Sequence, residues 1–165
     1  MENRPLRIEF VKRADGAGLL RCYRADGSVT WKKQPERHAV HFTHHDLTHY
    51  AVETTLGYGQ GFFGLIAAGW DIEDTAGKGA RGPLPDEAGE VEKVVGLFDS
   101  ERGSGTIWTA DEFAEFAPRK LTRKLDEASI RAIRSTRAEL FRRWAAVEIG
   151  STLELEYAPP QRVLR

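Results

Sequence analysis

Five histidines lie within twelve residues, and two of them have the spacing of metal ligands. His45 and His49 are four residues apart, and Glu53 follows after four more. On a helix, residues four apart lie one above the other on the same face. Neutral imidazole is a good ligand for zinc, copper, nickel and iron. The spacing therefore predicts that zinc or another divalent transition metal binds between His45 and His49.

A stable metal site needs at least a third ligand from the protein. Glu53 is the candidate on the same helix, and Glu73 is the candidate from an acidic run that follows the next predicted helix. If that second helix folds back on the first, its end returns to the level of the two histidines. The remaining candidates for completing the site are Asp71, Asp74, His38 and His41.

The segment His45-Asp46-Leu47-Thr48-His49 resembles the His-Glu-x-x-His motif of zinc metallopeptidases. In that family both histidines bind zinc and the glutamate activates a water molecule, and in the glutamate-zincin branch a later antiparallel helix supplies the third ligand. The resemblance covers these five residues and extends, through the second helix, to Glu73. It implies metal-assisted hydrolysis, with the shorter Asp46 at the position of the general base. Glu53, outside the motif, is the second candidate for the base.

The same residues also allow a purely structural interpretation. Thr43 and Asp46 have the spacing of a capping box, in which Asp46 would stabilise the start of the helix. His45 and His49 would then be core residues that bind backbone carbonyls or nearby acids. Under this interpretation the protein has no catalytic site, so the sequence leaves open whether it is an enzyme.

Charge is distributed unevenly along the second half of the chain. Residues 71–101 include nine acidic and three basic residues, whereas residues 118–143 include nine basic and three acidic ones. Such segregation fits contact with nucleic acid, self-association of unlike patches, or neutralisation within the fold. Nucleic acid is not favoured, because no binding motif is present and no aromatic residues alternate with the arginines. An exposed basic helix face is predicted from Lys124, Arg131, Arg134 and Arg142. A non-catalytic protein that self-associates through opposed charge patches is thus the alternative function.

Bulk composition narrows the class of protein. The 165 residues are 41% hydrophobic and 30% charged, which predicts a single globular domain over residues 1–165. The net charge of −1 gives no overall attraction to nucleic acid or acidic membranes. The longest apolar stretch, residues 61–70, is about half of what spans a bilayer. These two features predict that the protein has no membrane partner. Cys22 is the only cysteine, which is typical of a reducing compartment, and we therefore expect a cytoplasmic protein.

The pattern of apolar residues predicts an α+β fold. Alternating apolar positions and Asp-Gly turns predict three N-terminal antiparallel strands, and a further strand near the C-terminus is expected to join their sheet. Helical spacing and capping residues predict four to five helices packed against this sheet. The strands are expected over residues 6–12, 19–24, 28–33 and 152–157. The helices are expected over residues 43–56, 62–68, 86–98 and 125–148, with a short one between residues 109 and 118.

Overall fold

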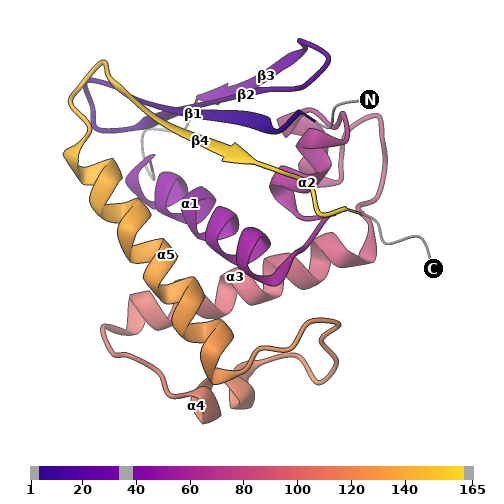
Figure 1. The fold of residues 1–165 in the computed structure, drawn as a ribbon, viewed down its shortest axis with the longest axis vertical. Helices are drawn as coiled ribbons and strands as arrows, with labels where there is room; N and C mark the ends of the chain where they lie inside the picture. The colour runs from indigo at the N-terminus through magenta and orange to yellow at the C-terminus, as the bar shows by residue number, and fades with distance from the viewer. Residues whose placement is uncertain (1–3, 34–38, 162–165) are drawn as a thin grey trace.

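A four-stranded antiparallel sheet forms one side of the molecule in the computed structural model, which describes residues 4–33 and 39–161 (Figure 1). The strand order is β3-β2-β1-β4, so the C-terminal strand joins the edge formed by the first strand. The predicted sheet of three N-terminal strands and one C-terminal strand is thereby confirmed. The strands are β1 (Leu6–Lys12), β2 (Gly18–Tyr23), β3 (Val29–Lys33) and β4 (Thr152–Tyr157).

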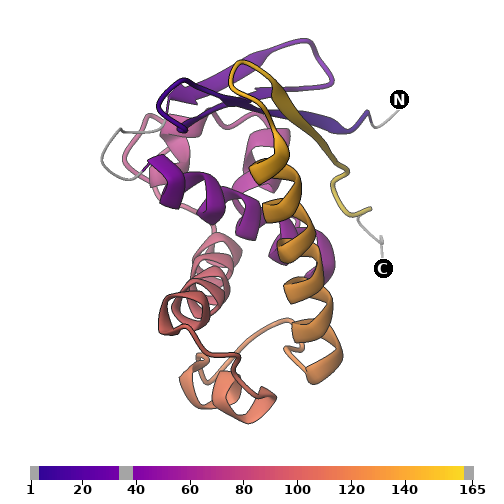
Figure 2. The ribbon, with the colours of Figure 1, turned by 90° about the vertical axis from the view of Figure 1, so that its left-hand side faces the viewer.

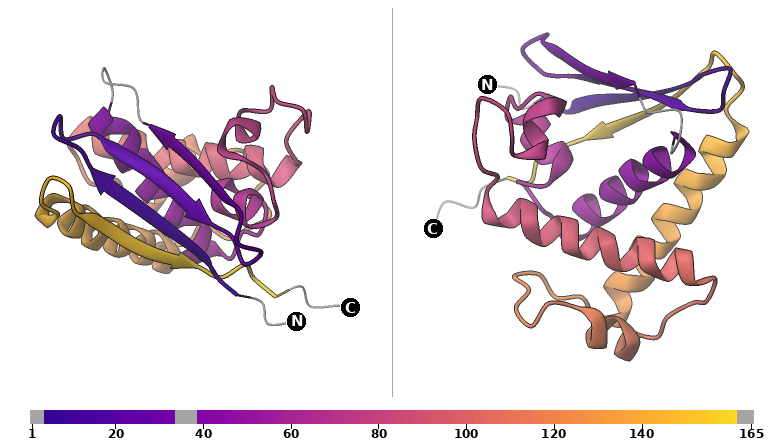
Figure 3. Two further views of the ribbon diagram at one scale, coloured as in Figure 1. Left: turned by 90° about the horizontal axis from the view of Figure 1, so that it is seen from above. Right: turned by 180° about the vertical axis from the view of Figure 1, so that it is seen from behind.

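Helices cover one face of this sheet, as the views from above and behind show (Figure 3). Among the described residues, five α-helices follow β3 and precede β4, which confirms the α+β fold class. None of the helices in the described part of the chain combines the length and apolar character needed to cross a bilayer. The helices are α1 (Ala39–Leu56), α2 (Phe62–Ala67), α3 (Asp86–Ser104), α4 (Ala110–Phe116) and α5 (Glu127–Ala146), with a 3₁₀ helix η2 (Ile72–Ala76).

Helix α1 lies between the sheet and α3, and α5 runs along both layers (Figures 1 and 2). Strand alternation turns one set of apolar side chains toward the helices, where they form a first core with α1, α2 and the end of α5. A second core fills the space between α1, α3, α4 and α5. Because α1 contributes to both cores, its polar side chains are held between two packed layers. The first core includes Ile8, Phe10, Leu20, Leu47 and Phe63, and the second includes Ala51, Val52, Val95, Phe98 and Ile133.

The start of α1 differs from the prediction. The helix begins at Ala39, so Thr43 lies inside it and is not its N-cap, and the predicted capping box with Asp46 is wrong. Thr43 is fully buried and faces β2, where a Cβ on Gly18 would lie 2.6 Å from its hydroxyl oxygen. The threonine is therefore explained by close packing of α1 against the sheet.

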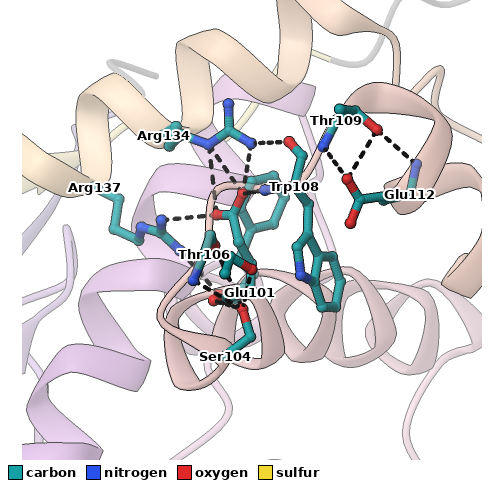
Figure 4. Close-up of polar contacts among 9 residues, drawn as sticks. Glu101, Ser104, Thr106, Trp108, Thr109, Glu112, Arg134 and Arg137 are labelled. Carbon is teal, nitrogen blue, oxygen red and sulfur yellow. Dashed lines mark hydrogen bonds and ion pairs between the residues drawn. The ribbon is translucent and has the colours of Figure 1, made fainter.

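Helix α3 continues past the predicted end at Phe98 to Ser104, and a buried carboxylate in its last turns is neutralised from α5 (Figure 4). Glu101 is 2% exposed, and its oxygens accept hydrogen bonds from Arg137 at 3.0 Å and from Arg134. Burial alone would raise the pKa of Glu101, but these guanidinium groups and the backbone N–H of Trp108 hold the pKa below its ordinary value.

This contact corrects one expectation about the charge runs. Arg134 does not belong to an exposed basic face, since it turns toward Glu101 and also donates to the carbonyl of Trp108 at 2.7 Å. The acidic and basic runs thus neutralise each other at this point inside the fold, and the ion pair fixes α3 against α5. The position of α3 matters because that helix contributes to the site described next.

Candidate metal centre

Two histidines of α1 face two carboxylates of α3. His45 Nδ1 lies 2.6 Å from Asp99 Oδ2, and His49 Nε2 lies 2.9 Å from Glu92 Oε1. The contacts run in opposite directions along the two helices, so α1 and α3 are antiparallel. The seven-residue separation of Glu92 and Asp99 places them two turns apart on one side of α3. Antiparallel packing of the two helices therefore brings four ionisable groups into one row.

Three of these side chains form a group that can hold a metal ion. Single ligand atoms of His45, His49 and Glu92 all lie within 4.8 Å of one another. The Nε2 atoms of both histidines face the same carboxylate, at 3.9 Å for His45 and 2.9 Å for His49. Ligands of a tetrahedral zinc ion, with bonds of about 2.0–2.1 Å, lie about 3.3 Å apart. The Glu92 side chain is 54% exposed and has room to adjust to that spacing.

The other nitrogen of each histidine is bound by a second carboxylate. Asp99 lies at Nδ1 of His45, and Glu53 lies 3.1 Å from Nδ1 of His49. In metal sites a carboxylate commonly accepts the Nδ1–H of a histidine ligand, which fixes the tautomer and directs Nε2 to the metal. Both imidazoles of the candidate centre have this arrangement.

Electrostatics at His49 are dominated by its two carboxylates. The imidazole is 2% exposed, and burial alone would lower its pKa. Hydrogen bonds from the ring to Glu53 and Glu92 outweigh burial and raise the pKa of His49 to about 10. Burial alone would raise the pKa of Glu92. The contact with His49 lowers this pKa by more, so it lies below its ordinary value. Without a metal, the site therefore holds a protonated His49 between two carboxylates.

Glu53, predicted as both a metal ligand and a base, lies on the opposite side of His49 from Glu92. It is fully buried, and its second oxygen accepts the backbone N–H groups of Phe63 at 3.0 Å and Gly64 at 3.3 Å. Glu53 thus accepts hydrogen bonds from two backbone N–H groups in the first turn of α2, which have no acceptor within the helix. Any Cβ on Gly61 would lie 2.5 Å from its carboxyl carbon, so the glycine makes room for this contact. These contacts give Glu53 an orienting position, outside the three-residue group.

A cavity of about 780 Å³ opens beside the group, and His45, His49 and Glu92 all line it. Asp46 also lines it and is 5% exposed. The pKa of the Cys22 thiol is raised to about 12, mainly because the thiol is buried and to a smaller extent by the negative charge of Asp46. The volume is in the range of small-molecule sites. The remaining walls come from β3, α2, η2 and the first turns of α1, and include Trp31, Lys32, Phe42, Phe62 and Ile72.

The other predicted ligands lie near the group without joining it. Glu73 and Asp71 line the cavity from the η2 region. Asp74 accepts the backbone N–H of Asp71 and so caps η2. The exposed His41 stacks its ring on His45, with centroids 6.1 Å apart. His38 lies outside the described residues.

Sequence reasoning missed Glu92 and Asp99. Both are charged residues on a helix that has many, and only its packing against α1 singles them out. One signal was available: both acids lie along the same edge of the apolar stripe of Val91, Val95 and Phe98, at the border of the buried face.

Comparisons with protein-family models, curated proteins and solved structures found no match to this chain.

Proposed function

We propose that this protein binds a divalent transition metal, zinc being the first candidate, through His45, His49 and Glu92. The observation that carries the proposal is the convergence of both Nε2 atoms on one carboxylate, with a further carboxylate at each Nδ1. Two histidines and a glutamate are a ligand set of catalytic zinc sites, in which water or substrate takes the fourth position. A histidine with a purely structural role needs only one such partner, whereas His45 and His49 each have a carboxylate at both ring nitrogens.

We further propose that the metal supports hydrolysis of a substrate bound in the adjoining cavity. A metal-bound water has a pKa near neutrality and is a potent nucleophile. Of the two carboxylates predicted as general bases, Asp46 lines the cavity and Glu53 does not. Asp46 is therefore the residue to which we assign the base role. A cytoplasmic setting is part of the same proposal and is supported by the single, buried Cys22.

Zinc affinity tests the binding proposal. In a titration against a competing chelator, Glu92→Gln removes one charged ligand and should weaken zinc binding by at least about 100-fold. Asp86→Asn is the matched control, because Asp86 lies exposed on the same helix and outside the three-residue group. Equal zinc affinity in the wild type and Glu92→Gln would refute the ligand set.

Hydrolysis is tested separately on the zinc-loaded protein with aryl esters, aryl phosphates and short peptides. Turnover that is lost in Glu92→Gln and reduced at least about 100-fold in Asp46→Asn is the expected result. A protein that binds zinc but turns over none of these substrates would refute the hydrolytic part alone.

Self-association through opposed charge patches is the alternative function, and the contacts favour it less. Three residues of the predicted basic face are exposed but pair with neighbouring carboxylates: Lys124 with Asp126, Arg131 with Glu127, and Arg142 with Glu139. Their charges are balanced locally. Unchanged sedimentation after neutralising the three basic residues together would exclude this function.

A further inference from the structure

The cavity beside the candidate metal centre has in its wall a cation, Lys32, with no ion-pair partner in the part of the chain that the structure describes. Lys32 lies on β3 and is half-buried, and its ammonium group lies 5.5 Å from the ring centre of Phe42 on α1. Within the described residues, no carboxylate lies at ion-pairing distance from Lys32. A partly desolvated ammonium group held over an aromatic ring is suited to pairing with an anion that enters from solution.

Four acids of the described chain line the cavity, and none of them lies at ion-pairing distance from Lys32; Asp46, on α1, is buried. Asp71 is bound by Arg24 at 2.9 Å, and Glu92 is bound by His49. Glu73 is exposed on η2. The cavity therefore combines a lysine that is unpaired among the described residues with a nearby centre that becomes more positive when it binds a metal.

The remaining walls include three aromatic side chains, along with aliphatic residues, two threonines and the exposed Lys33. Trp31, Phe42 and Phe62 line the same space, from β3, α1 and α2. Trp31 is 63% exposed, which is unusual for so large an apolar side chain and indicates a surface that a ligand can cover. A ligand matching these walls has an apolar or aromatic body and one anionic group.

We propose that the cavity binds a small aryl or alkyl acid, a carboxylate or a phosphate monoester, whose anionic group pairs with Lys32 while its apolar body contacts the aromatic walls. This inference rests on the proposed function for its interpretation as a substrate class, because the ligand would lie beside His45, His49 and Glu92. Its binding part stands on the cavity alone.

Calorimetric titration of the full chain tests it, first without metal and then loaded with zinc. The probes are phenylacetate and phenyl phosphate, with phenylacetamide as the uncharged analogue. The variant is Lys32→Gln, and Lys93→Gln is the matched control. Lys93 is exposed, follows Glu92 on α3 and does not line this cavity, so its substitution removes the same charge elsewhere.

We expect at least one anion to bind the wild type, and to bind Lys32→Gln about tenfold more weakly, the effect of one charge-assisted hydrogen bond. Lys93→Gln should retain wild-type affinity, and phenylacetamide should bind about tenfold more weakly than phenylacetate. The tighter of the two anions identifies whether carboxylate or phosphate is preferred.

Absence of binding by both anions up to about 10 mM, or equal affinity in the wild type and Lys32→Gln, would overturn the inference. Zinc content measured on the same samples keeps the two proposals apart. Lys32-dependent binding in a protein that takes up no zinc would sustain this inference and refute the metal centre. Zinc uptake without anion binding would do the reverse.

Discussion

Replacement of Glu53 by glutamine tests how the candidate centre selects the metal-binding form of His49. The substitution keeps the shape of a fully buried side chain and removes its charge. The amide oxygen should remain on the backbone N–H groups of Phe63 and Gly64, because an amide nitrogen there would face two donors. The amide nitrogen is then left at Nδ1 of His49 as a donor.

A donor at Nδ1 reverses the tautomer of the imidazole. Nδ1 must accept, so the single proton of a neutral ring lies on Nε2, the atom that faces Glu92 and the candidate metal position. In the wild type, zinc displaces the Nε2 proton of the protonated ring and leaves Nδ1–H bound to Glu53. In Glu53→Gln, a neutral ring can free Nε2 for zinc only by placing its proton on Nδ1, where it faces the N–H of the new amide. Loss of such an orienting partner costs about 10- to 100-fold in metal affinity, or about 1.4–2.8 kcal/mol.

Chelator-competition titration with zinc measures the effect, with circular dichroism as the check on folding. Glu73→Gln is the control, since Glu73 is an exposed carboxylate that lines the cavity outside the three-residue group. We expect its zinc affinity to stay within about twofold of the wild type. Wild-type affinity in Glu53→Gln, or a larger loss in Glu73→Gln, would refute the orienting role of Glu53.

Two further predictions concern the framework that positions the site. Glu101→Gln leaves two guanidinium groups without their buried partner and should destabilise the fold by about 3 kcal/mol near pH 7 in urea unfolding. Because folding lowers the pKa of Glu101, its contribution is present above the ordinary carboxyl value and is lost as pH falls through the folded value. The difference between wild type and variant should therefore shrink below about pH 4, and a constant difference would contradict this. Gly18→Ala should lower the free energy of unfolding by about 1–3 kcal/mol, because the added methyl group would clash with Thr43. Gly89→Ala is the control: nothing lies within 4 Å of the added methyl group, so this change should be neutral or stabilising. Equal stabilities of the two variants would refute the close packing of Gly18 against Thr43.

Elements with local signals could be predicted from the sequence. Strand alternation and Asp-Gly turns place the sheet, and the spacing of His45 and His49 places both on one helix face. The N-cap predicted at Thr43 is wrong. A threonine suits an N-cap but equally suits a close tertiary contact such as the one with Gly18, and no local pattern distinguishes the two roles.

The third member of the candidate group could not be predicted. Glu92 lies 43 residues beyond His49, and the two meet because α1 and α3 pack antiparallel through a shared apolar core. Arg134 was expected to be exposed for a related reason: its partner Glu101 lies on another helix and is invisible to helix periodicity. Both differences come from packing between elements, whereas the elements themselves follow from local sequence.

Metal content per chain tests the central claim most directly. Protein purified without a histidine tag, loaded with zinc and dialysed, should retain about one equivalent by mass spectrometry. The folded His45→Ala/His49→Ala double variant should retain none. No zinc in the wild type, or a full equivalent in the double variant, would contradict the account.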